Sequence, residues 1–160
     1  MNRRSTIAAL AVFAVLVFGV WLYRWCQPER QVRRAQGRLL AAAESGDMDS
    51  LAQMIAADYR DGWGHDKTFV LRVGKEVFTD FKNLDIGREE VALEGFGAQW
   101  TLREKLTVSG FGGPLAMAVR QRMSQIHEPF TMTWRKDGGD WVLTGLTQPE
   151  IKAEEMNAGF

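Results

Sequence analysis

Apolar residues in the first half of the chain recur every three or four positions, which is the spacing of one face of an α-helix. Pro28 suits the first turn of such a helix, and Gly46 followed by Asp47 ends it and caps the next. Asp66 is placed to cap a third helix. The apolar positions of the three expected helices are, in order, Val32, Ala35, Leu39, Leu40 and Ala43; Met48, Leu51, Met54 and Ile55; and Val70, Val73, Val77, Phe78 and Phe81.

After Phe81 the period changes to two, the alternation of a half-buried β-strand. Leu84 to Leu93 alternates loosely, whereas Trp100 to Val108 keeps its apolar side chains at even positions, and Phe130 to Trp134 does the same. We therefore expect antiparallel strands over these runs.

Two features organise the rest of this region. Asp137-Gly138-Gly139-Asp140 predicts a hairpin turn, after which Trp141 to Leu146 returns as the last strand. Pro114 to Ile126 interrupts the alternation with apolar residues at helical spacing, which predicts a short helical insertion over one end of the sheet.

The N-terminal segment has the composition of a membrane anchor. Ser5–Tyr23 carries no charged side chain, and a helix over Ile7–Tyr23 nearly reaches across a hydrocarbon core of ~30 Å. Large residues stand where a cleaved signal peptide, or a lipoprotein signal ending at Cys26, needs small ones. We expect an uncleaved anchor over residues 1–26 that contacts the bilayer through Ile7–Tyr23.

Two signals disagree about the side of the membrane on which the rest of the chain lies. Residues 1–38 hold seven arginines against one acid, and most of these arginines follow the apolar run, which favours a cytoplasmic body. The short Arg3-Arg4 start is typical of export signals, and long domains translocate largely regardless of charge. We expect a single-pass protein with an extracytoplasmic, periplasmic-side body, and a cytoplasmic body is the alternative.

Composition narrows the classes of function. The chain of 160 residues has 20 basic and 20 acidic side chains, and this neutral balance argues against nucleic-acid binding. The single cysteine excludes an internal disulfide and a cysteine-rich metal cluster. His65 and His127 lie far apart in the sequence, and there is no glycine-rich phosphate loop, so we expect neither a metal nor a cofactor.

Helices followed by antiparallel strands predict an α+β domain, with three helices packed on a curved sheet of four to six strands. We place this domain at residues 27–148 and a C-terminal tail at 149–160. The element order, with the runs Gly46–Leu51, Asp58–Asp61 and Trp141–Leu143, resembles the nuclear transport factor 2-like (NTF2-like) superfamily. That resemblance implies a cone-shaped fold around a pocket, and the superfamily includes ketosteroid isomerase, scytalone dehydratase, polyketide cyclases and many small domains without activity.

The richest cluster of reactive side chains is Tyr59, Asp61, His65 and Asp66. A histidine beside carboxylates could act as an acid–base pair, and a phenol could polarise a carbonyl. The same residues also suit a structural role, with Asp66 capping a helix and Asp61 in a turn.

Glu104 is the other catalytic candidate. It shares the parity of the apolar residues in its strand, so a regular strand would point it at the apolar side, where the pKa of a carboxyl rises. A β-bulge that resets the parity and turns Glu104 outward is the alternative.

Several large rings could line a pocket together with Glu104. The candidate ligand-binding residues are Tyr59, Trp63, Trp100, Glu104 and Trp134. The apolar surface of these rings favours a small apolar ligand. The open face of the sheet suggests a homodimer.

Two functional hypotheses remain. The first is a membrane-anchored binding domain without chemistry of its own, which takes a small apolar ligand or a protein partner. The second is a small lyase or isomerase that acts on an apolar carbonyl compound, with a pocket carboxylate or histidine as general base. The absence of a convincing acid–base motif favours the first.

Overall fold

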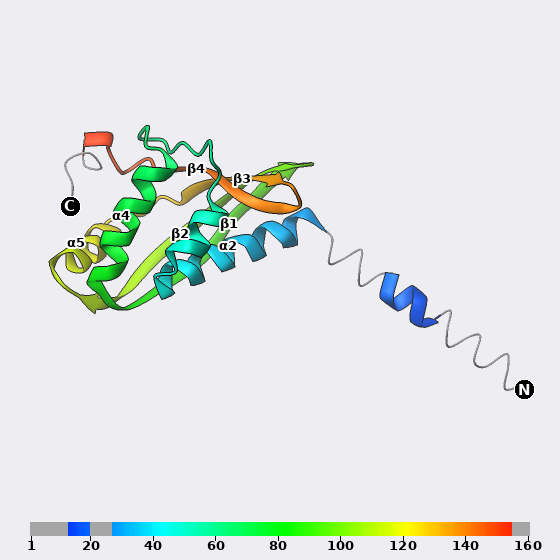
Figure 1. Cartoon of the computed structure of the whole chain (residues 1–160), viewed down its shortest axis with the longest axis horizontal. Helices are drawn as coiled ribbons and strands as arrows, with labels where there is room; N and C mark the ends of the chain where they lie inside the picture. The colour runs from blue at the N-terminus through cyan, green and yellow to red at the C-terminus, as the bar shows by residue number, and fades with distance from the viewer. Residues whose placement is uncertain (1–12, 20–26, 155–160) are drawn as a thin grey trace, which may run out of the picture.

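The computed structural model describes residues 13–19 and 27–154. Residues 13–19 are helical. The elements that follow are α2 (Pro28–Ser45), α3 (Met48–Met54), α4 (Lys67–Asp80), β1 (Phe81–Phe96), β2 (Gln99–Gly112), α5 (Pro114–Met123), β3 (Phe130–Asp137) and β4 (Asp140–Thr147). The expected α+β class and the order of helices and strands are therefore confirmed (Figure 1).

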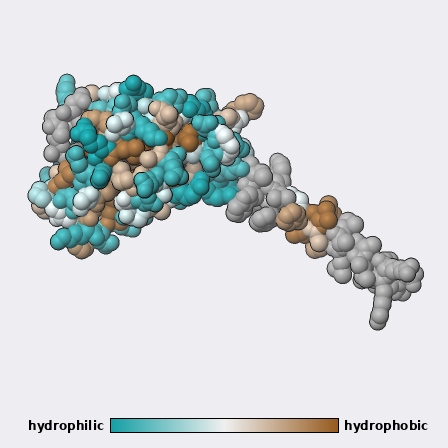
Figure 2. All heavy atoms as spheres, in the orientation of Figure 1, coloured by the Kyte–Doolittle hydropathy of each residue, from teal (hydrophilic) through white to brown (hydrophobic). Residues whose placement is uncertain are grey.

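The expected membrane anchor, Ile7–Tyr23, lies mostly outside the described residues, and so do Arg3, Arg4 and Arg24, which bear on its orientation. Its described part, residues 13–19, exposes large apolar side chains such as Phe13 and Leu16, and Figure 2 shows this segment as apolar beside a mainly polar domain surface. Among residues 13–19 and 27–154, no helix combines the length and the hydropathy needed to cross a bilayer.

The sheet has four antiparallel strands in the order β1-β2-β3-β4, at the lower end of the expected range. β1 and β2 form one long hairpin along their whole length. On its other edge, β2 pairs with β3 over its first part alone, Gln99–Glu104. The turn expected at Asp137–Asp140 joins β3 to β4, and its two glycines, Gly138 and Gly139, adopt positive φ angles of 60° and 125°. Such angles disfavour residues with a Cβ, which explains the glycine pair.

Helix α2 lies against the sheet and contributes to its main core. Val32 and Ala35 pack with Leu102, Trp134 and other buried residues of the strands. Gly46 ends α2 in the left-handed conformation, and the Asp47 side chain caps α3 through the backbone amide of Ser50, as the sequence indicates.

Helices α4 and α5 lie at the end of the domain away from the N-terminus of α2 (Figure 1). The Asp66 carboxylate caps α4 by accepting a hydrogen bond from the backbone amide of Phe69, and the expected insertion forms α5 against β2 and α4. The stripe expected to be buried on α4 is only half-buried, and Phe81, its last member, is buried as the first residue of β1. A helix at the end of the sheet has fewer neighbours to cover it, which explains this difference.

Candidate functional site

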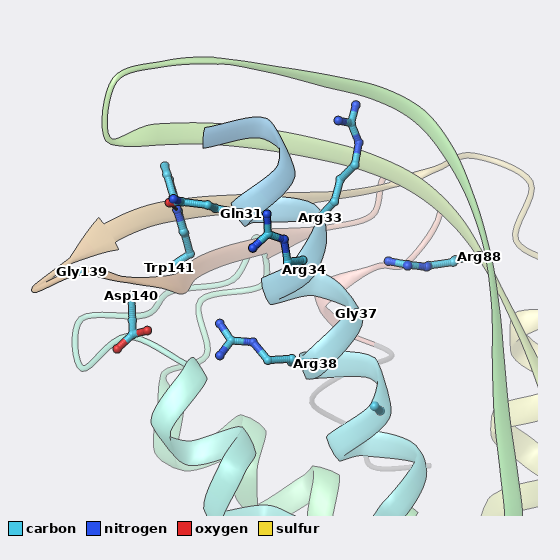
Figure 3. Close-up of a pocket in the computed structure, with 10 residues that line it drawn as sticks. Gln31, Arg33, Arg34, Gly37, Arg38, Arg88, Gly139, Asp140 and Trp141 are labelled. Atoms are coloured by element: carbon cyan, nitrogen blue, oxygen red, sulfur yellow. Dashed lines mark hydrogen bonds between the residues drawn. The ribbon is translucent and has the colours of Figure 1, made fainter. Parts of the chain in front are cut away.

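A wide cleft of about 860 Å³ lies over the outer face of α2 (Figure 3). On one side it is bounded by Arg88 of β1, and on the other by the β3–β4 hairpin. Gly37 and Ala41 contribute almost no side chain to its floor, which explains why this face of the helix is hollow. The residues that line it, called the α2 cleft below, are Gln31, Arg33, Arg34, Gly37, Arg38, Ala41, Arg88, Gly139, Asp140 and Trp141.

Two of the arginines of the cleft contact carboxylates. Arg33 donates from Nε and one terminal nitrogen to the two carboxylate oxygens of Glu90, both at 2.8 Å. This paired hydrogen bond raises the pKa of Arg33 and lowers the pKa of Glu90. Arg88 is held more loosely, with a guanidinium nitrogen 3.8 Å from Oε1 of Glu104.

Glu104 lies beneath this cleft, and its side chain is only 2% exposed. Gln36 Nε2 donates to its Oε2 at 2.8 Å. Burial raises the pKa of Glu104, while this hydrogen bond and the charge of Arg88 oppose the rise. Gln36 Oε1 is buried without a hydrogen-bond partner, and a proton on the Glu104 carboxyl is the kind of donor that this oxygen lacks.

The structure decides between the two orientations considered for Glu104. A register irregularity falls at Val91 of β1, between Glu90 and Ala92, and β2 keeps its regular alternation opposite it. The side chain therefore points inward, and the alternative of a bulge that turns Glu104 outward is wrong. Its hydrogen-bond partner comes from a polar residue of α2 rather than from the aromatic residues expected around it.

The Asp61–His65 cluster lies in the loop between α3 and α4, beside β4. The Asp61 carboxylate accepts hydrogen bonds from the backbone amides of Trp63 at 3.0 Å and His65 at 2.8 Å, and it lies 3.1 Å from Nδ1 of His65. The His65 ring stacks on Phe69 with centroids 3.9 Å apart. These contacts organise the loop, so the structural interpretation of the cluster has direct support.

The four aromatic candidates either belong to the core or donate hydrogen bonds to backbone carbonyls. Tyr59 and Trp134 belong to the main core, burial raises the pKa of the Tyr59 phenol, and the hydroxyl of Tyr59 and Nε1 of Trp134 are buried without partners. Trp63 donates to the backbone carbonyl of Ile151, and Trp100 to that of Gly97. None of the four lines the α2 cleft, whereas Trp141 does and is held there by Gln31 at 2.9 Å.

Sequence reasoning missed the residues that surround Glu104. Gln36 follows Val32 by one helical turn on the apolar face of α2, and a polar residue at such a position is a signal comparable to the one that drew attention to Glu104. The sequence around Arg88 does not indicate that this residue lies beside Glu104, because its position depends on the pairing of β1 with β2.

A second cleft of about 520 Å³ lies between the β1–β2 hairpin and the segment that connects α5 to β3. Leu106, Met123 and Ile126 line it together with Arg88 and His127, among others. Glu104 lines neither cleft. Among residues 13–19 and 27–154, no three side chains of His, Cys, Asp or Glu are grouped as a metal site requires.

Comparisons with solved structures identify the fold. No protein-family model matches the sequence, and no curated protein matches it. An NTF2-like protein from Cytophaga hutchinsonii is similar with a TM-score of 0.56 and 12% identity, over 76% of this chain and 98% of that one. A proposed dehydratase of the NTF2-like family from Streptomyces avermitilis has a TM-score of 0.56 and 18% identity, over 74% and 91%.

A proposed aromatic ring hydroxylase from Novosphingobium aromaticivorans is similar at a TM-score of 0.58 and 13% identity, over 74% of this chain and 85% of that one. At these identities the likeness concerns the fold alone. The fold is NTF2-like, as the resemblance of the sequence implied.

Proposed function

We propose that this chain is a membrane-tethered binding domain without catalytic activity, whose ligand occupies the α2 cleft. The observation that carries the proposal is the separation of the open cleft from the acid–base groups. The cleft has the exposed side chains of Arg38 and Arg88 on its walls and Gly37 on its floor, whereas the carboxyl of Glu104 is buried below.

The contacts of the acid–base candidates support a structural role for them. A general base has to lie within hydrogen-bond reach of the proton it removes. Glu104 is engaged by Gln36 and Arg88, and Asp61 is engaged by its own loop and by His65. Each of these carboxyls therefore has partners within the protein.

The α2 cleft favours a ligand chemistry different from the one expected from the aromatic residues. Its walls are cationic, whereas the sequence suggested a small apolar ligand. The second cleft has three apolar side chains, Leu106, Met123 and Ile126, among a lining that is otherwise mostly polar or charged. The apolar ligand, the protein partner and the homodimer remain predictions.

A lyase or isomerase with Glu104 as general base is the second candidate function. It is supported by the raised pKa of this buried carboxyl, and a dehydratase is proposed among the proteins of similar fold. In that function Arg88 would have to move for a substrate to approach Glu104.

Filling the floor of the cleft tests the proposal. The full chain is purified from membranes in a mild detergent, and native mass spectrometry determines which small molecule it retains. We expect Gly37→Leu to lose this ligand, because the side chain would occupy the floor. Gly37→Ala is the matched control, since its methyl group would make ordinary contact with Arg88 at 3.6 Å and should raise the free energy of unfolding by up to about 1 kcal/mol. Equal retention in the Leu variant, or a wild-type chain that carries no ligand, would contradict the proposal.

The tether is proposed from the sequence of Ile7–Tyr23. We expect the full chain to stay with the membrane fraction after extraction at alkaline pH, and a variant with Val15→Lys and Leu16→Lys to be released. Removing two apolar side chains and adding two charges in the middle of the segment should abolish insertion, since each central lysine costs roughly 3 kcal/mol. Release of the unaltered chain would contradict the tether.

A further inference from the structure

Arg88 lies between the α2 cleft and the buried carboxyl of Glu104. Its side chain extends from β1 toward Gly37 of α2 (Figure 3), where a methyl group on the glycine would contact the guanidinium at 3.6 Å. The side chain of Arg88 is 42% exposed and lines the cleft, and one of its nitrogens lies 3.8 Å from Oε1 of Glu104. The same guanidinium group therefore faces both the open cleft and a buried carboxyl.

The charge of the cleft favours an anionic ligand. Among the described residues that line it, four are arginines and Asp140 is the one acid. Accepting the proposed function of the cleft, we infer that its ligand carries an anionic group that binds Arg88. Arg88 leaves Glu104 to bind this group, and the Glu104 carboxylate then takes up a proton from the solvent.

The loose contact between Arg88 and Glu104 allows an anion to compete for the guanidinium. Charge-assisted hydrogen bonds between arginine and carboxylate are about 2.7–2.9 Å long, and the paired contact of Arg33 with Glu90 has this length. The 3.8 Å approach of Arg88 to Glu104 is beyond hydrogen-bond distance. An oxyanion in the cleft offers Arg88 the short hydrogen bonds that this contact lacks.

The departure of Arg88 changes the balance of charge around Glu104. The α2 helix contributes Gln36, which donates to the carboxylate, and the residue opposite on β3 is uncharged. Strand β1 contributes Arg88, which lowers the pKa of Glu104, and Glu90, which raises it and is itself paired with Arg33. Once Arg88 turns to the ligand, burial and Glu90 act without that opposing charge, so the pKa of Glu104 rises further.

Gln36 can hold the Glu104 side chain in either protonation state. Its Nε2 donates to Oε2 of the carboxylate at 2.8 Å, whereas its Oε1 is buried without a hydrogen-bond partner. Turning the amide by 180° exchanges the two atoms, and Oε1 then accepts a hydrogen bond from the protonated carboxyl. The neutral carboxyl therefore keeps a hydrogen bond in the core after Arg88 has left it.

Calorimetric titration of the full chain with sodium sulfate, in uncharged detergent micelles, tests the inference. Sulfate does not titrate between pH 4 and pH 9, so any proton taken up on binding is taken up by the protein. All titrations use one fixed ionic strength, because salt screens such contacts. Repeating them in buffers with different enthalpies of ionisation measures the number of protons taken up per sulfate.

We expect saturable binding of sulfate that is coupled to the uptake of up to about one proton. Binding raises the pKa of Glu104, so the affinity is greatest below the pKa of the free protein. The affinity then falls as the pH rises through the pKa of the complex, by up to about tenfold per pH unit.

Three variants show which residues are responsible. Arg88→Gln should weaken sulfate binding about tenfold or more, because charge-assisted hydrogen bonds are lost. Glu104→Gln should bind at least as tightly as the wild type and without proton uptake, because its neutral amide does not titrate. Arg103→Gln is the matched control, since it removes the same charge from an exposed position on β2 outside the cleft, and it should leave affinity and proton uptake unchanged.

The outcomes separate this inference from the proposed function. Equal affinities of the Arg88 and Arg103 variants would overturn the inference, and so would sulfate binding by the wild type without proton uptake. Proton uptake that persists in Glu104→Gln would also overturn it, because another group would then be the one that titrates. If sulfate does not bind although Gly37→Leu abolishes retention of the natural ligand, the inference is overturned and the α2 cleft stands as a ligand site.

Discussion

Replacing Trp134 with alanine is expected to remove most of the stability of the domain. Trp134 is the largest fully buried side chain among the described residues. It packs in the core that joins α2 to the sheet. Truncation of a buried tryptophan costs about 3–5 kcal/mol, out of a total free energy of unfolding of about 5–15 kcal/mol for an ordinary domain. Urea unfolding followed by circular dichroism measures the loss.

Trp134→Phe is the matched control for this prediction. It keeps an aromatic ring in the core and removes the indole N–H, which is buried without a partner. Relief from that unpaired donor offsets part of the lost packing, so we expect a cost of about 1–2 kcal/mol. If the alanine variant lost no more free energy of unfolding than the phenylalanine variant, the packing of Trp134 would not be central to the stability of the core.

Exchanging Glu104 for glutamine is expected to raise the stability of the protein at neutral pH and to change its pH dependence. Burial raises the pKa of this carboxyl in the folded protein, so the folded state holds the proton more tightly than the unfolded chain does. The contribution of Glu104 to stability is therefore greatest below its unfolded pKa, about 4.3, and falls as the pH rises from there through its folded pKa. Within that window the slope is at most about 1.4 kcal/mol per pH unit.

Three neighbouring side chains determine the size of this effect. Gln36 donates to the carboxylate and Arg88 attracts it, and both lower the pKa, whereas the nearby Glu90 raises it. The Glu104→Gln variant keeps an oxygen that accepts from Gln36 and gains an amide that can donate to the unpartnered Gln36 Oε1. In urea unfolding at a series of pH values, the free energy of unfolding of the variant should increase relative to that of the wild type as the pH rises from about 4.

Glu104→Ala is the contrasting variant. It removes the acceptor for Gln36 and the ion pair with Arg88 and leaves a cavity, so we expect it to cost about 2–4 kcal/mol at neutral pH. A Glu104→Gln variant that was less stable than the wild type at pH 7, with an unchanged pH slope, would show that the buried carboxyl is ionised without penalty.

Much of the fold follows from local patterns in the sequence. The alternation around Trp134 and the glycine pair in the β3–β4 turn depend on interactions between near neighbours in the chain, and the structure has both. The expected burial of the α4 stripe was too high, because burial depends on which elements cover a helix. A periodic pattern identifies an apolar face but not the extent of its coverage.

The candidate site was predictable only in part. The inward direction of Glu104 was predictable from strand parity, because parity depends on a single strand. The contact of Glu104 with Gln36 joins residues 68 positions apart, and the position of Arg88 follows from the pairing of two strands. The α2 cleft was not predicted, because it results from the absence of a side chain at Gly37 between two hairpins.

The most direct test of the central claim compares ligand retention in Glu104→Gln and Gly37→Leu by native mass spectrometry of the full chain. A binding domain that holds its ligand in the α2 cleft should retain the same molecule, with the same mass and stoichiometry, in Glu104→Gln and lose it in Gly37→Leu. Retention of a different molecule by Glu104→Gln than by the wild type would contradict the claim, since an accumulated substrate would show that Glu104 takes part in a reaction.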